Sequence, residues 1–261
     1  MEGLKMKAVL LTALGVGGAT LLGAVLGFIF KKISHRAGDI ILSFAAGVML
    51  AAAVLGLVIP SVEYGGGGAR GLVIAVIGIF LGAMTVNAFD KLVPHLHKLT
   101  GIDHENGEAG QKSGKADKVL LFVLAIAIHN LPEGIAAGVG FGTDNVADGI
   151  LIAVGIALQN IPEGIAIIAP MLSAGIKPRR TFLIAAATGA VEVVGTLFGY
   201  LAVTLAQAIL PFGLAFAGGT MLYIISDEMI PETHAHGSER SATYALIVGF
   251  CLMLVMDVLL G

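Results

Sequence analysis

The chain contains no tryptophan and a single cysteine, Cys251, among its 261 residues. One cysteine excludes an intrachain disulfide and any cysteine-cluster metal site. Charged residues make up only 13% of the chain, whereas a soluble domain carries about 25%. The net charge of −3 does not suggest a nucleic-acid partner. Scarce charge, 57% hydrophobic residues and 37 glycines, which suit close helix packing in lipid, indicate a polytopic helical membrane protein.

Long apolar runs predict eight membrane spans, because a helix needs about 20 apolar residues to cross the bilayer. The predicted spans are residues 8–30, 40–60, 71–92, 119–141, 147–170, 182–203, 207–231 and 242–261. The fold class is therefore all-α, with one transmembrane domain over residues 1–261. Pro211 lies either inside the seventh span or at its start. The first run exceeds the about 7–15 apolar residues of a signal peptide, so it is interpreted as a span.

The placement of basic residues predicts the orientation, since Lys and Arg accumulate in cytoplasmic loops. Twelve of the 15 Lys and Arg residues lie in the odd-numbered loops, which puts both termini outside. The third loop, residues 93–118, is predicted to be a mobile cytoplasmic segment, either a plain linker or a loose metal-binding tract. It carries His95, His97 and His104. The fourth loop carries Asp144 and Asp148 without a basic residue, which would draw cations toward an outer mouth.

Two similar hexapeptides interrupt the apolar spans: His129-Asn130-Leu131-Pro132-Glu133-Gly134 and Gln159-Asn160-Ile161-Pro162-Glu163-Gly164. Each places a polar residue and a carboxylate four positions apart on one helix face. Such groups are costly in lipid and indicate function. Each proline also frees a backbone carbonyl one turn earlier, which must find a partner. Paired motifs on antiparallel neighbouring helices are typical of an inverted repeat around a midplane site.

Helical rise predicts that the polar groups of several spans share one depth. His129, Gln159 and Glu192 lie about 15–18 Å into a hydrocarbon core about 30 Å thick, and Met49 lies at a similar depth. The candidate metal ligands are His129, Asn130, Glu133, Gln159, Asn160, Glu163, Glu192 and Met49. Taken singly, Asn130 and Asn160 are also explained as polar helix contacts, and Met49 as packing. Three buried carboxylates together are not explained in that way.

The donor types predict the chemical class of the ligand. Imidazole with carboxylates and amides suits Zn²⁺, Fe²⁺, Mn²⁺ or Cd²⁺, whereas Ca²⁺ and Mg²⁺ prefer all-oxygen sites. The metal is expected as transported substrate, with no catalytic cofactor. The alternatives are an intramembrane metal-dependent hydrolase and a metal-sensing membrane protein. The hydrolase would need H-E-x-x-H, and this chain has H-N-L-P-E with one histidine, so it is not expected to be an enzyme. A sensor would not need paired motifs.

With these motifs the sequence resembles the ZIP (Zrt/Irt-like) divalent metal transporters, and its HNLPEG/QNIPEG form resembles the GufA-type branch. Ala190-Val191-Glu192 and the stretch from Asp227 to His234 extend the resemblance over nearly the whole chain. The resemblance implies metal import toward the cytoplasm, Zn²⁺ above all, across the plasma membrane (the inner membrane of a bacterium). It also implies a homodimer in the lipid bilayer and an elevator-like motion of spans 1, 4, 5 and 6 against spans 2, 3, 7 and 8.

The resemblance also implies the roles of the site residues and of Asp227 and Glu228, and the rest of the ion path is predicted from the sequence itself. The main site would comprise His129, Glu133, Gln159 and Glu163, with Met49 nearby. An adjoining second site would comprise Asn130, Glu133, Asn160, Glu163 and Glu192. The exit would pass Asp227, Glu228 and Glu232 toward His95 and His97. The entrance would use Asp144 and Asp148, and Asp257 is either an entrance residue or a polar helix contact. Some relatives carry Asp in place of Asn160 and His in place of Asp227; the first difference predicts weaker occupancy of the second site.

Overall fold

The structure, a computed structural model, describes residues 2–30, 34–99, 129–143, 145–173 and 175–260, and these residues contain helices and no strand. The helices are α1 (Glu2–Ile29), α2 (His35–Ala51), α3 (Ile59–Tyr64), α4 (Gly68–Leu99), α6 (Val146–Ser173), α7 (Pro178–Leu205), α8 (Leu210–Ile224), α9 (Ile230–Thr233) and α10 (Glu239–Leu260). Three short elements connect them: η1 (Ala52–Val58), η2 (Gln207–Ile209) and η3 (Ile225–Met229). Residues 129–140 are also helical.

Seven helical stretches of the described chain are long and apolar enough to cross a membrane. They are Lys5–Ile29, His35–Tyr64, Gly68–Phe89, Val146–Ser173, Pro178–Leu205, Gln207–Thr233 and Glu239–Leu259. The predicted fourth span, 119–141, lies partly outside the described residues, and its described part is helical from 129 to 140. The all-α membrane-spanning class is thus confirmed, whereas the orientation of the termini and the inverted repeat stay predictions.

The start of α8 and the end of α4 bear on two predictions made from the sequence. Pro211 lies in the first turn of α8, after the short 3-10 helix η2, so it begins that helix and does not interrupt it. The helix α4 continues to Leu99, so residues 93–99, expected in the third loop, are helical. Leu92, Leu96 and Leu99 continue the apolar helical spacing up to that point. The rest of the predicted loop, from residue 100 to 118, lies outside the described residues.

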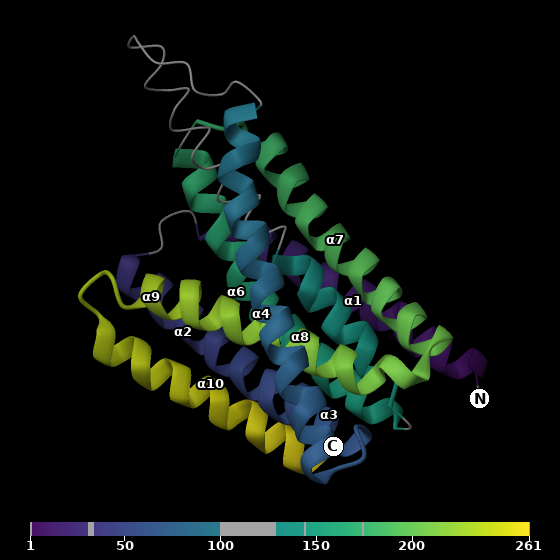
Figure 1. Cartoon of the computed structure of the whole chain (residues 1–261). Helices are drawn as coiled ribbons and strands as arrows, with labels where there is room; N and C mark the ends of the chain where they lie inside the picture. The colour runs from purple at the N-terminus through teal and green to yellow at the C-terminus, as the bar shows by residue number, and fades with distance from the viewer. Residues whose placement is uncertain (1, 31–33, 100–128, 144, 174, 261) are drawn as a thin grey trace.

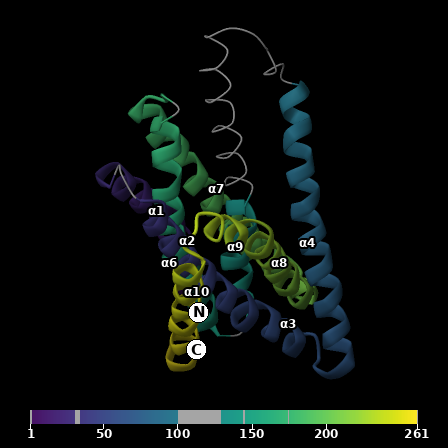
Figure 2. The ribbon, with the colours of Figure 1, turned by 90° about the vertical axis from the view of Figure 1, so that its left-hand side faces the viewer.

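The helices form two groups that pack against each other (Figures 1 and 2). The α1 group contains α1, the helical segment 129–140, α6 and α7; α1 packs along both α6 and α7. The segment 129–140 joins this group because Gly134 and Gly138 lie against the backbone of Glu192 and Thr196 in α7. The α2 group contains α2, η1, α3, α4, α8, η3, α9 and α10, with α4 packed on α8 and α10 on α2.

The largest apolar core lies where the two groups meet. Ile152 and Ile156 of α6 are fully buried there together with Met49, Leu57 and Met253 of the α2 group. The helix α6 also contacts α2, η1 and α10. The helix α6 belongs to the α1 group through its packing on α1, and its contacts with the α2 group make it much of the boundary between the groups.

Two spans change from α-helical to π-helical winding just before an Ile-Pro pair. In the second span, η1 precedes Ile59 and Pro60; in the seventh, η3 precedes Ile230 and Pro231. A proline lacks the N–H that would continue an α-helical ladder, and single π-helical turns occur frequently at functional sites. The turn η3 carries Asp227 and Glu228, two of the predicted exit residues.

Candidate metal centre

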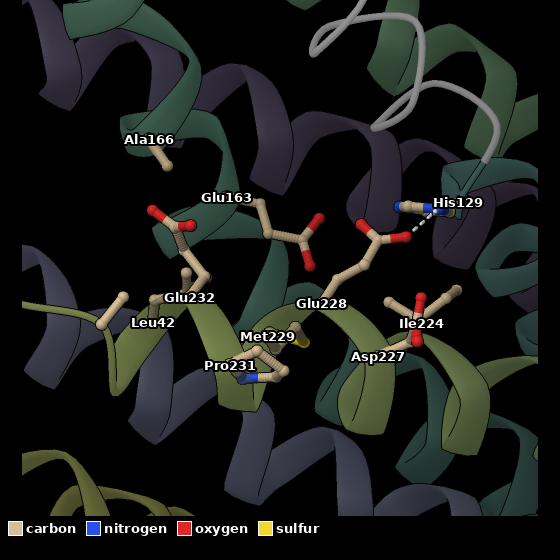
Figure 3. A pocket seen from close by; sticks show the side chains of 11 residues that line it. Leu42, His129, Glu163, Ala166, Ile224, Asp227, Glu228, Met229, Pro231 and Glu232 are labelled. Atoms are coloured by element: carbon tan, nitrogen blue, oxygen red, sulfur yellow. Dashed lines mark ion pairs between the residues drawn. The ribbon is translucent and has the colours of Figure 1, made fainter. Parts of the chain in front are cut away.

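A cavity of about 620 Å³ opens between the two groups of helices. The α1 group contributes His129 and Glu163 to its lining, and the α2 group contributes Asp227, Glu228 and Glu232. Figure 3 shows these side chains around one shared space. Two predicted ligands of the main site and three predicted exit residues therefore line the same cavity.

One polar contact crosses the boundary between the groups inside this cavity. His129 Nε2 lies 2.9 Å from Glu228 Oε1, and the histidine is almost completely buried (Figure 3). The imidazole comes from the segment 129–140, whereas the carboxylate comes from η3. A predicted metal ligand of the α1 group thus contacts a predicted exit residue of the α2 group.

The two hexapeptides meet through Glu133 and Gln159. The Gln159 amide Nε2 donates to Glu133 Oε1 at 2.9 Å, and both side chains are fully buried. The i, i+4 spacing places Glu133 on the same helix face as His129, and Glu163 on the same face as Gln159. The sequence predicts only that the two motifs share one depth in the membrane. In the structure they are in direct contact.

The third carboxylate, Glu192 of α7, is the centre of a hydrogen-bond network inside the α1 group. The Asn130 amide donates to Glu192 Oε1, and the Thr20 hydroxyl donates to the same oxygen at 2.8 Å. The Asn160 amide donates to Glu192 Oε2 at 2.7 Å. One buried carboxylate thus ties α1, the segment 129–140 and α6 to α7.

These contacts leave a set of buried acceptor oxygens that no hydrogen-bond donor of the described residues reaches. They are Asn130 Oδ1, Glu133 Oε2, Gln159 Oε1 and Asn160 Oδ1. A buried acceptor without a donor costs about 1–3 kcal/mol, and several on one set of helices cannot satisfy one another. A cation bound among them would satisfy them, so the donor set fits a metal ion.

The predicted ligands that the structure describes do not surround a single point. Among the described residues, no three His, Cys, Asp or Glu side chains stand together in a ligating arrangement. His129 and Glu163 face the cavity, whereas Glu133 contacts Gln159 and Glu192 contacts the two asparagines. The structure therefore brings the candidate residues into one region, in two hydrogen-bonded sets and one cavity.

Other predicted residues lie away from the cavity lining. Met49 is fully buried in the apolar core between the groups. Asp148 lies in the first turn of α6, where Asn145 Nδ2 donates to its Oδ1 at 2.9 Å, and Asp257 lies near the end of α10. Asp144 lies outside the described residues. His95 and His97 lie on the last turns of α4, where only the backbone is described.

Thr20 is a residue of the network that the sequence pattern does not reveal. It is fully buried in the middle of α1 and belongs to no motif. The only available signal is a hydroxyl in an apolar span that also contains Thr12, and threonine occurs in such spans without a role because its hydroxyl can bond its own helix. Its contact with Glu192 joins residues 172 positions apart, which sequence spacing does not predict.

An all-helical membrane protein whose helices enclose buried carboxylates, amides and an imidazole belongs to the class of polytopic ion-handling membrane proteins. The family model described as ZIP Zinc transporter matches residues 94–257. The chain belongs to the ZIP zinc transporter family. Family membership places it among transporters and excludes the alternative of an intramembrane hydrolase.

Several relatives match over most of their length. "Zinc transporter GufA" of Myxococcus xanthus is 42% identical over 260 residues, covering 98% of this chain and 100% of that protein. "Zinc transporter ZIPB" of Bordetella bronchiseptica is 39% identical, covering 93% of this chain and 78% of that protein. "Zinc transporter ZIP11" of Homo sapiens is 34% identical, covering 94% of each chain. The predicted resemblance to the ZIP family and to its GufA-type branch is confirmed.

Proposed function

We propose that the protein imports Zn²⁺ into the cytoplasm by alternating access, with the cation bound between the two hexapeptides. The observation that carries this proposal is the cavity between the groups, which is lined by His129 and Glu163 from one group and by Asp227, Glu228 and Glu232 from the other. A cation in such a place would pass from the first set of ligands to the second. The names of the relatives favour Zn²⁺ as the substrate.

The donor chemistry supports a borderline divalent cation. Ligands of the main site would be the imidazole of His129, the carboxylates of Glu133 and Glu163, and the amide oxygen of Gln159. Nitrogen and carboxylate oxygen are common Zn²⁺ ligands, and the same set accepts Cd²⁺, Fe²⁺ and Mn²⁺. Met49 would approach only if its group moved relative to the α1 group, since it lies in the core between them.

Alternating access is supported by how glycines pack within and between the groups. A methyl group placed on Gly134 would lie 2.3 Å from the Glu192 carbonyl oxygen, inside the α1 group. One on Gly47 would lie 1.9 Å from the carbonyl oxygen of Leu246, inside the α2 group. Such backbone-to-backbone contacts hold each group as a unit.

Between the groups the nearest atoms belong to side chains. A methyl group on Gly56 of η1 would meet Ile152 Cγ1 of α6 at 2.8 Å, and one on Gly155 of α6 would meet Met253 Sδ of α10 at 3.1 Å. Side chains slide and repack more easily than interlocked backbones. The α1 group is therefore proposed to move against the α2 group, as the family resemblance implies.

The proposed path begins at Asp144 and Asp148 on the outer side, with Asp257 near the mouth. The ion then binds between the hexapeptides and leaves past Asp227, Glu228 and Glu232 toward His95 and His97. The transporter would act as a homodimer in the plasma membrane, with the α2 group as the static part.

Proteoliposomes containing the purified protein test this function. We expect saturable Zn²⁺ accumulation, with Cd²⁺ competing, and slower uptake at lower external pH because His and carboxylate ligands must be deprotonated to bind metal. Vesicles without protein and vesicles with the Glu163→Gln variant are the controls. Zn²⁺ accumulation equal to that of empty vesicles at every pH would refute the proposal.

Asn160 is expected to limit the site to one ion. Its amide donates to Glu192 Oε2 at 2.7 Å, so it occupies an oxygen that a second cation would need. Three carboxylates also balance the charge of two divalent ions poorly in a low-dielectric site. We expect Asn160→Asp to raise the Zn²⁺ held between the hexapeptides from about one to about two ions per chain, measured by mass spectrometry of the metal after dialysis against metal-free buffer, which removes weakly bound ions.

The double variant Asn160→Asp/Glu192→Gln provides the matched control, because it keeps the new carboxylate and removes an old one. It should return the metal content to that of the parent protein. Two ions in the parent protein, or one ion in Asn160→Asp, would contradict the expectation.

A further inference from the structure

Two histidines and a buried aspartate lie close together at one end of the cavity, outside the proposed transport site. Leu42 of α2 and Ala235 of the α9–α10 connection line the cavity there. Asp39 lies one turn before Leu42, and His236 follows Ala235 directly. His236 Nδ1 lies 3.0 Å from Asp39 Oδ1, so the two side chains link α2 to the connection.

The contact fixes the orientation of the histidine ring. Asp39 is 5% exposed, and no donor among the described residues reaches its Oδ2. A buried carboxylate that accepts from Nδ1–H leaves the Nε2 lone pair of the imidazole free to bind a metal. The His236 side chain is 32% exposed, so this nitrogen belongs to an accessible ring. Carboxylate, histidine and metal form this same arrangement in many zinc sites.

A second imidazole lies directly beside the first. The rings of His35 and His236 are stacked with centroids 5.1 Å apart and planes 28° apart. An ion must lie in the plane of each ring that binds it, so nearly parallel rings do not share an ion until one of them turns. His35 is exposed at the start of α2, and exposed side chains change rotamer within nanoseconds.

We propose that His236, oriented by Asp39, and His35 form a separate docking site for a Zn²⁺-like divalent cation at the rim of the cavity. Two neutral imidazoles with water as the remaining ligands suit Zn²⁺, Cd²⁺ and Co²⁺. With few protein ligands the site binds weakly and releases readily. If the proposed transport function holds, this site receives ions that have passed Glu232.

The neighbouring His234 serves as a matched control. Its Nδ1 lies 2.9 Å from the Ile230 carbonyl oxygen and its Nε2 lies 3.1 Å from Thr243 Oγ1. Both ring nitrogens of His234 are therefore engaged, whereas the contact of His236 with Asp39 uses Nδ1 and leaves Nε2 for a metal ion. If the loss of any histidine from this connection weakened Zn²⁺ binding, His234→Ala and His236→Ala would weaken it equally.

The experiment uses the full chain in detergent micelles, in a background that removes competing ligands. Glu133→Gln and Glu163→Gln disable the transport site, and His95→Ala, His97→Ala and His104→Ala remove the three histidines of the predicted third loop. Zn²⁺ binding is measured by equilibrium dialysis, and Co²⁺ binding by its visible absorption. His236→Ala, His35→Ala, Asp39→Asn and His234→Ala are then compared in this background.

We expect about one Zn²⁺ per chain in the background protein, lost in His236→Ala and His35→Ala and kept in His234→Ala. Asp39→Asn should weaken binding about 10–100-fold, as loss of an orienting carboxylate does. Equal binding in His236→Ala and His234→Ala, or no binding in the background protein, would overturn the docking site. Vesicle uptake by the chain with the transport site intact is measured separately: absent uptake with retained docking would count against the transport function alone.

Discussion

Replacing Glu133 by glutamine is expected to reduce Zn²⁺ uptake in proteoliposomes to the level of empty vesicles. Glutamine keeps the size of the side chain but removes its charge, and Glu133 is fully buried with one oxygen that no described donor reaches. Removing one partner of a buried charge pair costs about 3–5 kcal/mol, which corresponds to about 100-fold weaker cation binding or more. The measurement is initial uptake of radioactive zinc over a range of concentrations.

Two controls separate loss of a ligand from loss of the fold. Glu239→Gln removes an exposed carboxylate at the start of α10 and should leave uptake unchanged. The elution volume of Glu133→Gln on gel filtration should match that of the parent protein, because Gln159 can still contact the new amide. Parent-level uptake by Glu133→Gln would show that the cation does not bind between the hexapeptides.

The paired hexapeptides could be recognised from the sequence because lipid makes buried polar residues informative. A glutamate in a soluble helix is ordinary, whereas Glu133 or Glu163 inside an apolar span demands a partner. The rise per residue then predicts that the motifs share one depth. The contact between Glu133 and Gln159 is in line with that reasoning, and the all-helical class follows from the apolar runs alone.

The lateral contacts of the site could not be predicted in the same way. Depth says nothing about which helices are neighbours, so neither the contact of Thr20 with Glu192 nor that of His129 with Glu228 follows from spacing. The π-helical turn η3 is also invisible to a 3.6-residue pattern, although it rotates Asp227 and Glu228 relative to the preceding turns. The contact between Asp39 and His236 joins residues 197 positions apart and depends on tertiary packing.

The two hexapeptides differ in their first residue, which is His129 in one and Gln159 in the other, and the structure gives these two side chains different contacts. His129 contacts the α2 group through Glu228, whereas Gln159 contacts Glu133 inside the α1 group. The imidazole thus stands at the boundary between the two groups, and the amide lies within the α1 group. Because Glu228 occupies the same Nε2 that a metal would use, an ion can bind His129 through that nitrogen only after this contact breaks.

A disulfide across the boundary is expected to stop transport, because it would prevent the groups from moving against each other. A Cβ atom on Gly155 of α6 would lie 3.4 Å from the Ala52 Cβ of η1, close to the about 3.5–4.5 Å that disulfides require. Cys251 is first replaced by alanine, and Ala52→Cys and Gly155→Cys are then combined. Uptake should fall to that of empty vesicles on oxidation and return on reduction, with thiol labelling measuring the extent of the bond.

A second cysteine pair inside one group isolates the effect of restrained motion from that of the bond itself. A Cβ atom on Gly140 would lie 3.7 Å from the Ile152 Cβ, and both residues belong to the α1 group, so this bond joins parts that are proposed to move together. Oxidation of Gly140→Cys/Ile152→Cys should leave uptake at the level measured under reducing conditions. Full oxidation of the Ala52→Cys/Gly155→Cys pair with undiminished uptake would instead place the moving boundary elsewhere, since a covalent bond between η1 and α6 does not permit one to slide past the other.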